Sequence, residues 1–170
     1  MVITTNSGLW RYKIGDTVKF TCLNPFRIKI TGRTKHFINV FGEELVIENA
    51  EKALSLTSEL TKSSISDYTV GPVFMGSNTK GSHEWLIEFD KQPDDLSKFM
   101  EILDLNLQSL NSDYEAKRYK SSTLELPKLV VARKNLFYDW LSSKNKLGGQ
   151  NKVPRLSNSR EFIEELISMN

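Results

Sequence analysis

The sequence is poor in the residues that build disulfides and metal sites. Among its 170 residues it has one cysteine, Cys22, and two histidines, His36 and His83. A single cysteine excludes an internal disulfide and a cysteine-rich zinc site. Two histidines leave little material for a histidine-based metal site, and we expect each to be structural or exposed. We therefore predict no metal ligands in this chain.

Long apolar runs and an excess of one charge are also lacking. No run approaches the ~20 apolar residues that a membrane helix needs. The first six residues, 1–6, have neither the basic start nor the apolar core of a signal peptide. The 23 Lys and Arg nearly balance the 21 Asp and Glu, for a formal charge of +2. We therefore expect a cytoplasmic protein that binds neither membranes nor nucleic acid.

What remains is the composition of an ordinary globular protein, 39% hydrophobic and 26% charged. The length suits one domain, or one domain with an appendage. Residues 1–31 show period-two alternation interrupted by Gly, Asp, Asn and Pro, which is typical of strands and turns. Three short strands without a helix make a poor core. We therefore interpret residues 1–31 as the strand-rich edge of a larger domain.

From residue 32 onward, strands and helices alternate. The patterning predicts strands at 36–40, 68–75, 84–89 and 128–133, and helices at 43–62 and from 93 to about 110. The order strand-helix-strand-strand-helix-strand predicts an α+β, ferredoxin-like (split βαβ) fold. A tail then carries a short helix at 135–144, a loop, and a last helix that Asn158 could cap. We assign residues 32–170 to one mobile α/β domain.

Three segments carry polar residues that a fold alone does not require. The first is 12–16, where the Asp16 carboxylate at a strand turn could accept two hydrogen bonds from a ribose diol. The alternative is an ordinary Gly-Asp turn. The second is 32–36, where Gly32 offers the backbone freedom of a hinge and Lys35 could change contacts between two states. A simple interdomain turn explains this segment equally well.

Near the second segment, Gly42 and Glu43 belong to a loop that runs into a helix N-terminus. Backbone N–H groups there could bind an anion, or the loop could be only a connection. The third segment is 147–155, where two glycines precede Lys152. A lysine on a mobile loop suits phosphoryl or nucleotidyl transfer, because its charge can neutralise a phosphate in the transition state. The alternative is a solvated basic face that includes Lys144, Lys146, Arg155 and Arg160.

Together, in this order, the three segments resemble a known superfamily. Residues 8–16 read Gly-Leu-Trp-Arg-Tyr-Lys-Ile-Gly-Asp and are similar to a signature of acyl-adenylate-forming enzymes. Residues 32–35 (Gly-Arg-Thr-Lys) and 41–44 (Phe-Gly-Glu-Glu) resemble the hinge motif of that superfamily. Residues 150–155, Gln-Asn-Lys-Val-Pro-Arg, resemble the ending of the Gretchen Hagen family of auxin-responsive acyl-acid amido synthetases. The likeness is closest to bacterial members and covers essentially the whole chain.

This resemblance implies a function and a role for each residue. It implies the C-terminal third of a ligase that uses ATP and Mg²⁺ to adenylate a carboxylic acid and then transfers the acyl group to an amine, usually an amino acid. Asp16 and Tyr12 would bind the nucleotide, and Lys152 would be catalytic in adenylation. Arg33 and Lys35 would form the hinge. Gly42 and Glu43 would lie on the acceptor side.

The resemblance also leaves open what lies outside the chain. The phosphate loop and the acyl pocket would belong to the N-terminal adenylation domain, so we expect residues 1–170 alone to be inactive and to bind ATP weakly. Lys13 stands where the signature usually has Arg, which replaces a bidentate contact by a point charge. Lys35 stands where the wider superfamily often has Asp. The alternatives are an acyl-CoA ligase of the same superfamily and a free-standing basic module that binds nucleic acid or phosphate.

Overall fold

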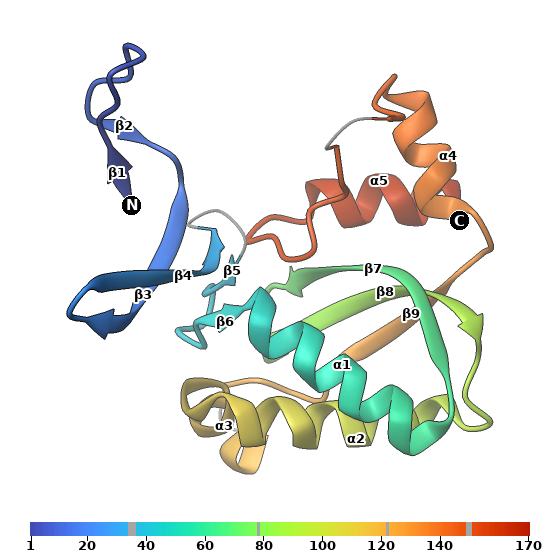
Figure 1. Cartoon of the computed structure of the whole chain (residues 1–170). Helices are drawn as coiled ribbons and strands as arrows, with labels where there is room; N and C mark the ends of the chain where they lie inside the picture. The colour runs from blue at the N-terminus through green and yellow to red at the C-terminus, as the bar shows by residue number, and fades with distance from the viewer. Residues whose placement is uncertain (34–36, 78, 122, 149–150) are drawn as a thin grey trace.

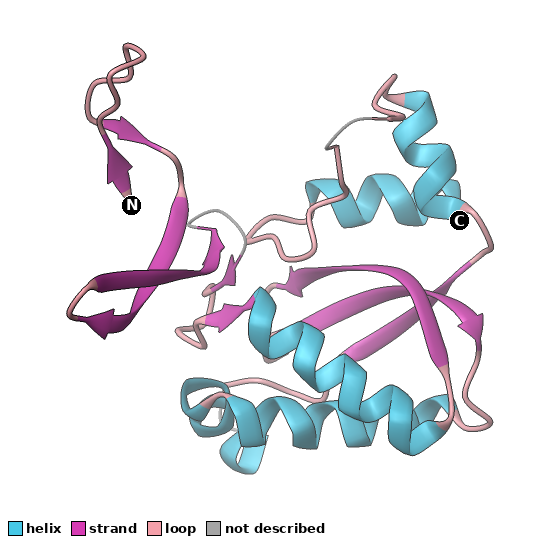
Figure 2. Ribbon diagram, viewed as in Figure 1, coloured by secondary structure: helices cyan, strands magenta, loops and turns pink. Residues whose placement is uncertain are grey.

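The N-terminal part of the chain contains strands and loops only. The computed structural model describes residues 1–33, 37–77, 79–121, 123–148 and 151–170. Strand β1 (Val2–Ile3) pairs with β2 (Tyr12–Lys13), and β3 (Asp16–Leu23) pairs with β4 (Phe26–Arg33), both antiparallel. Figure 2 shows this segment as strands and loops, beside a body that is rich in helices.

The β3–β4 ribbon has one apolar face that is open to solvent. Phe20 lies opposite Ile28 in the strand register, and Val18 lies opposite Ile30. Ile30 is 61% exposed and Phe26 75% exposed. Lys19 and Lys29 lie opposite each other at the intervening register position and belong to the other face. A two-stranded ribbon is only marginally stable alone, because it buries little apolar surface. We therefore expect another surface to cover this apolar face.

The main sheet is formed by β7 (Ser64–Val73), β8 (Ser82–Lys91) and β9 (Lys128–Ala132). β7 and β8 are antiparallel neighbours, and β9 lies parallel to β8 on its other side. Helices α1 (Ile47–Thr61) and α2 (Leu96–Leu110) cover one face of the sheet. Helices α4 (Leu136–Ser143) and α5 (Glu161–Met169) cover the other face, so the body has three layers (Figure 1).

The two faces of the sheet bury two separate apolar clusters. Along β8, Trp85 and Ile87 belong to the cluster beneath α1 and α2, whereas Leu86 belongs to the cluster with α4 and α5. This alternation is the period-two geometry of a strand covered on both sides. The large aromatic side chains of both clusters are buried, since Trp85 and Phe99 are fully buried and Trp140 is 3% exposed.

The α+β class is confirmed, but the arrangement of strands differs from the ferredoxin-like expectation. Among the described residues the sheet has three strands, and β9 occupies the position beside β8 through a parallel crossover. The strand expected at 36–40 is the two-residue β5 (Phe37–Ile38), which pairs with β6 (Leu45–Val46) instead of the main sheet. Helix α1 therefore begins at Ile47, because its expected first turn is taken by the β5–β6 hairpin.

Two further differences concern the helical layer. Leu60, an apolar residue within the predicted helix at 43–62, is 66% exposed near the end of α1. A helix that the patterning did not predict, α3 (Ser112–Arg118), follows α2 and continues into the 3₁₀ turn η1 (Tyr119–Ser121). Within the described ranges, no helix combines the length and the hydropathy needed to cross a bilayer.

Candidate active-site residues

Lys152 stands at the start of a segment that is anchored along the edge of the sheet. The residue is exposed, whereas the next one, Val153, is 4% exposed and packs with α4 and α5. The backbone of Val70 in β7 donates to the carbonyl of Arg155 at 2.9 Å and accepts from the N–H of Ser157 at 3.1 Å. Leu156 therefore forms an isolated parallel bridge with Val70, and Lys152 lies four residues before this anchored point.

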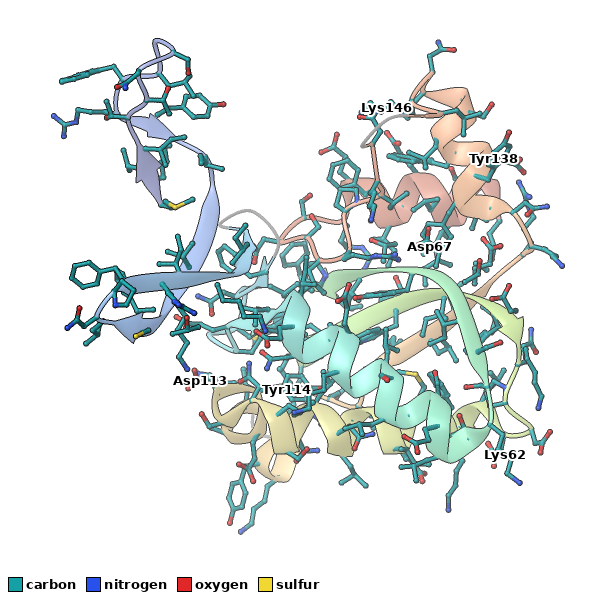
Figure 3. The ribbon with its side chains drawn as sticks, viewed as in Figure 1. Lys62, Asp67, Asp113, Tyr114, Tyr138 and Lys146 are labelled. Atoms are coloured by element: carbon teal, nitrogen blue, oxygen red, sulfur yellow. The ribbon has the colours of Figure 1, made fainter. Side chains whose placement is uncertain are left out.

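Arg155 strengthens this anchor. Its guanidinium lies 4.6 Å from the centre of the Tyr68 ring, forms an ion pair with Asp67, and donates to the Tyr68 carbonyl at 3.1 Å. Asp67 is labelled in Figure 3. Thr69 Oγ1 adds a hydrogen bond of 2.7 Å to the carbonyl of Pro154. The Pro-Arg pair that follows Lys152 is thus fastened to one strand.

Three of the basic residues around Lys152, namely Arg155, Arg160 and Lys144, are paired with carboxylates. Arg160 pairs with Glu84 and with Glu164, each at 2.8 Å, and Lys144 pairs with Glu165 at 2.9 Å. Carboxylates that already neutralise these groups reduce their attraction for a polyanion. The arrangement therefore gives little support to a nucleic-acid-binding face.

The residues expected to bind the nucleotide lie in the other part of the chain. Tyr12 is 53% exposed on β2. Asp16 begins β3 and lies directly opposite Arg33, the last residue of β4, in the strand register. The ribbon thus brings the expected ribose-binding residue next to an expected hinge residue. Lys35, the other hinge residue, lies outside the described residues.

Glu43 and Gly42 occupy a loop that is tied to the sheet. The Glu43 side chain is fully buried, and its carboxylate accepts from the Phe41 N–H at 2.7 Å and lies 2.8 Å from His83 Nε2. Burial favours a raised pKa for the Glu43 carboxyl, but the hydrogen bonds and the charge of His83 and the backbone N–H groups outweigh it, and the pKa is lowered. Gly42 adopts φ +81°, where glycine is favoured.

This loop has a clear structural role. His83 is buried and stacks on Tyr114 with ring centres 5.6 Å apart, so its expected structural role is confirmed. The acceptor-side role of Gly42 and Glu43 stays a prediction. The Glu43 carboxylate forms its contacts inside the domain, whereas Gly42 is exposed to solvent.

Comparison with known proteins gives the chain its family. The model of the GH3 family C-terminal domain matches residues 48–161, and the model of the GH3 family central domain matches residues 1–33. The chain belongs to the GH3 family. The family resemblance expected from the three segments is thereby confirmed.

Solved GH3 structures show the same fold. One, GH3.15 acyl acid amido synthetase, is 22% identical with a TM-score of 0.76, over 98% of this chain and 32% of that chain. Another, AtGH3.15 acyl acid amido synthetase in complex with 2,4-DB, is 21% identical with a TM-score of 0.73 over the same shares. The chain thus spans about a third of the GH3 structures it matches. No curated protein matches it.

Beneath the Glu43 loop, this GH3 chain contains a buried polar network. Tyr114, labelled in Figure 3, donates to Asp104 Oδ1 at 2.7 Å, and burial followed by the Asp104 charge raises its pKa. The Arg118 guanidinium donates hydrogen bonds to both carboxylate oxygens of Asp104, at 2.7 and 2.8 Å. These bonds hold α3 against α2, which explains why a mostly polar segment is helical there.

The sequence did not reveal that Asn158 connects the segment after Lys152 to the segment around Ile38. Asn158, expected to cap the last helix, instead donates to the Phe37 carbonyl at 2.9 Å and accepts from the Asn39 N–H at 2.8 Å. Helix α5 begins later, at Glu161. The only local signal was an Asn in a loop, which is typical of a cap or turn and does not reveal a partner about 120 residues away.

Proposed function

We propose that this chain forms the C-terminal part of an ATP-dependent acyl-acid amido synthetase. In this reaction a carboxylic acid is adenylated with release of pyrophosphate, and an amine, that of an amino acid, then attacks the acyl carbon and displaces AMP. The observation that carries the proposal is Lys152, an exposed ammonium on a segment anchored to β7 in a GH3 C-terminal domain.

The chemistry assigned to Lys152 follows from its placement. Negative charge develops on the α-phosphoryl oxygens as the carboxylate attacks, and a cation already positioned there stabilises this transition state. Because Arg155 and Ser157 are hydrogen-bonded to β7, the segment that follows Lys152 moves together with the domain. Rotation of the domain after adenylation would withdraw the ammonium and open space for the amine.

The two parts of the chain would divide the work at the hinge. Asp16 and Tyr12 belong to the strand segment, where they would bind the ribose and lie near the base. Arg33 ends β4, and Lys35 lies in the short link to β5, so rotation there would change the position of Lys152 relative to Asp16. The Gly42 loop follows the link and would approach the acceptor in the rotated state.

The nucleotide and the metal fit these residues differently. The exposed Lys152 and Tyr12 suit a nucleoside triphosphate, whose phosphates take a cation and whose base packs on an aromatic ring. Among the described residues, no group of three or more His, Cys, Asp and Glu side chains could hold a metal ion. We assign Mg²⁺ no ligand among the described residues and derive no step through it.

The partner in the proposal is an adenylation domain that supplies the phosphate loop and the acyl pocket. The exposed apolar face of the β3–β4 ribbon supports this partner, because the family model that matches residues 1–33 is that of the GH3 central domain. Such a face is stable in water only when another sheet or helix covers it. The chain without that domain is expected to be inactive.

The test uses the assembled enzyme, meaning this chain together with the adenylation domain on one polypeptide or two. Lys152→Ala is expected to lower acid-dependent pyrophosphate exchange by about 100-fold or more, the usual cost of removing a group that stabilises developing charge. Transfer from preformed acyl-adenylate to the amine should change by less than about 3-fold, since the lysine has left the site by then.

The matched control is Lys146→Ala, which removes another exposed lysine from the same loop. It should leave both half-reactions unchanged. Equal losses in adenylation and transfer for Lys152→Ala would contradict the role given to this residue. Faster transfer to coenzyme A than to any amino acid would identify an acyl-CoA ligase instead.

A further inference from the structure

Asn158 connects the segment that carries Lys152 to the segment that leaves the hinge. Its amide nitrogen donates to the Phe37 carbonyl and its amide oxygen accepts from the Asn39 N–H, at 2.9 and 2.8 Å. Phe37 is the first described residue after the link at 34–36. Asn158 follows directly on the strip that Ser157 fastens to β7.

The two hydrogen bonds use both ends of the Asn158 amide, its nitrogen and its oxygen. A side chain that both donates to and accepts from the backbone around Ile38 holds that segment in one register and one direction. Asn39 extends the connection, because its own side chain accepts from the Glu44 N–H at 3.2 Å. Ile38 is fully buried, so the segment that Asn158 grips is also packed into the body.

A local role does not account for this arrangement. Helix α5 begins at Glu161, and in the described structure its N-cap, Arg160, makes no side-chain cap bond. Asn158 lies outside that first turn. Its amide forms hydrogen bonds with residues that are 119 and 121 positions earlier in the chain. The contact therefore joins the segment around Ile38 to the segment at 153–158, and it does not cap helix α5.

We propose that Asn158 is a positioning residue, which holds the residues around Ile38 against the Lys152 segment so that rotation of the domain carries Lys152 to the reacting phosphate. The proposal rests on the function proposed above. Without the amide, the residues after the hinge can shift against the strip at 153–157 while the domain stays folded. Lys152 would then stop at a less accurate position in the adenylation state.

The test compares Asn158→Ala with Asn170→Ala in the assembled enzyme. Asn170 makes the same kind of contact, accepting from the Arg133 N–H at 2.7 Å and donating to the Val131 carbonyl at 3.0 Å, at the end of β9. Both variants lose one acceptor and one donor to backbone groups. A purely structural role therefore predicts similar losses of thermal stability and similar activities for the two.

The positioning role predicts different activities. Asn158→Ala should lower kcat for adenylation by about 10-fold or more, since small misplacements of a catalytic group are costly, with KM for ATP within about 2-fold. Transfer from preformed acyl-adenylate should stay within about 2-fold. Asn170→Ala should leave all three quantities unchanged. Equal adenylation rates in the two variants would overturn the proposal.

A second measurement separates this inference from the proposed function. Hydrogen exchange of the Asn39 amide should speed up about 10-fold or more in Asn158→Ala and stay at the wild-type rate in Asn170→Ala. Unchanged exchange would overturn the positioning role alone. Absence of pyrophosphate exchange in the assembled wild-type enzyme would instead refute the proposed function, and the positioning role with it.

Discussion

Replacing Glu43 by Gln tests how the loop after the hinge is held. In the native chain the buried carboxylate accepts from the Phe41 N–H at 2.7 Å and lies 2.8 Å from His83 Nε2. Gln keeps the shape and one carbonyl acceptor but removes the charge. Hydrogen bonds to a charged group contribute about 1.5–3 kcal/mol, against about 0.5–1.5 kcal/mol for neutral ones. Two weakened bonds predict a loss of about 2 kcal/mol.

The effect should depend on pH in a defined direction. The pKa of the Glu43 carboxyl is lowered in the folded chain from its ordinary value of 4.5, because His83 and the Phe41 N–H outweigh the cost of burial. A lowered pKa contributes stability that is fully present above pH 4.5 and is lost as the pH falls through the folded pKa. The difference between the wild type and Glu43→Gln should therefore shrink below this pH.

The assay is equilibrium unfolding by urea at pH 7, repeated at lower pH. At pH 7 a loss of about 2 kcal/mol corresponds to a decrease in Tm of about 4–8 °C for a domain of this size. Glu44→Gln is the matched control, because Glu44 is the adjacent residue and is exposed. A loss below about 0.5 kcal/mol at pH 7, or one that does not change with pH, would refute the reasoning.

Two further predictions concern a close contact and the open apolar face. A Cβ at Gly81 would lie 2.4 Å from Cε1 of the Phe41 ring, so Gly81→Ala should destabilise the chain by about 1–3 kcal/mol in urea unfolding, and adding Phe41→Leu should restore part of the loss. No destabilisation by Gly81→Ala would mean that the ring is not packed there. Phe26→Ser removes an apolar side chain that is 75% exposed, so thermal stability of the chain should be unchanged while affinity for the adenylation domain falls about 10-fold or more. Lys29→Ser, on the other face of the ribbon, should leave that affinity unchanged in pull-down titrations.

Much of the secondary structure followed from local pattern. Apolar residues at helical spacing predicted a helix from 93 to about 110, and three of them, Phe99, Leu103 and Leu107, are buried on one side of α2. The β-rich run at 84–89 predicted β8, whose neighbours Trp85 and Leu86 face opposite layers. Such patterns are readable because each depends on residues within a few positions of one another.

The errors arose where contacts between different elements decide the outcome. Helix α3 has one buried residue, Tyr114, and no apolar stripe, and it is held because its Tyr114 and Arg118 bind Asp104 of α2. The strand expected at 36–40 pairs with Leu45–Val46, which local patterning placed in a helix. The place of β9 beside β8 depends on how α2 crosses the sheet, and the order of predicted elements fits either arrangement.

The family and the candidate chemistry could be read from short motifs, because the residues at 8–16, 32–35, 41–44 and 150–155 are contiguous segments in a fixed order. The contacts that those residues make depend on the folded chain. In the folded chain Glu43 is buried beside His83, and Arg155 contacts the Tyr68 ring and pairs with Asp67. Asn158 forms a hydrogen bond with Phe37. The physical reason is that burial and hydrogen-bond partners come from segments 40 to about 120 residues apart, and no local pattern specifies which groups meet.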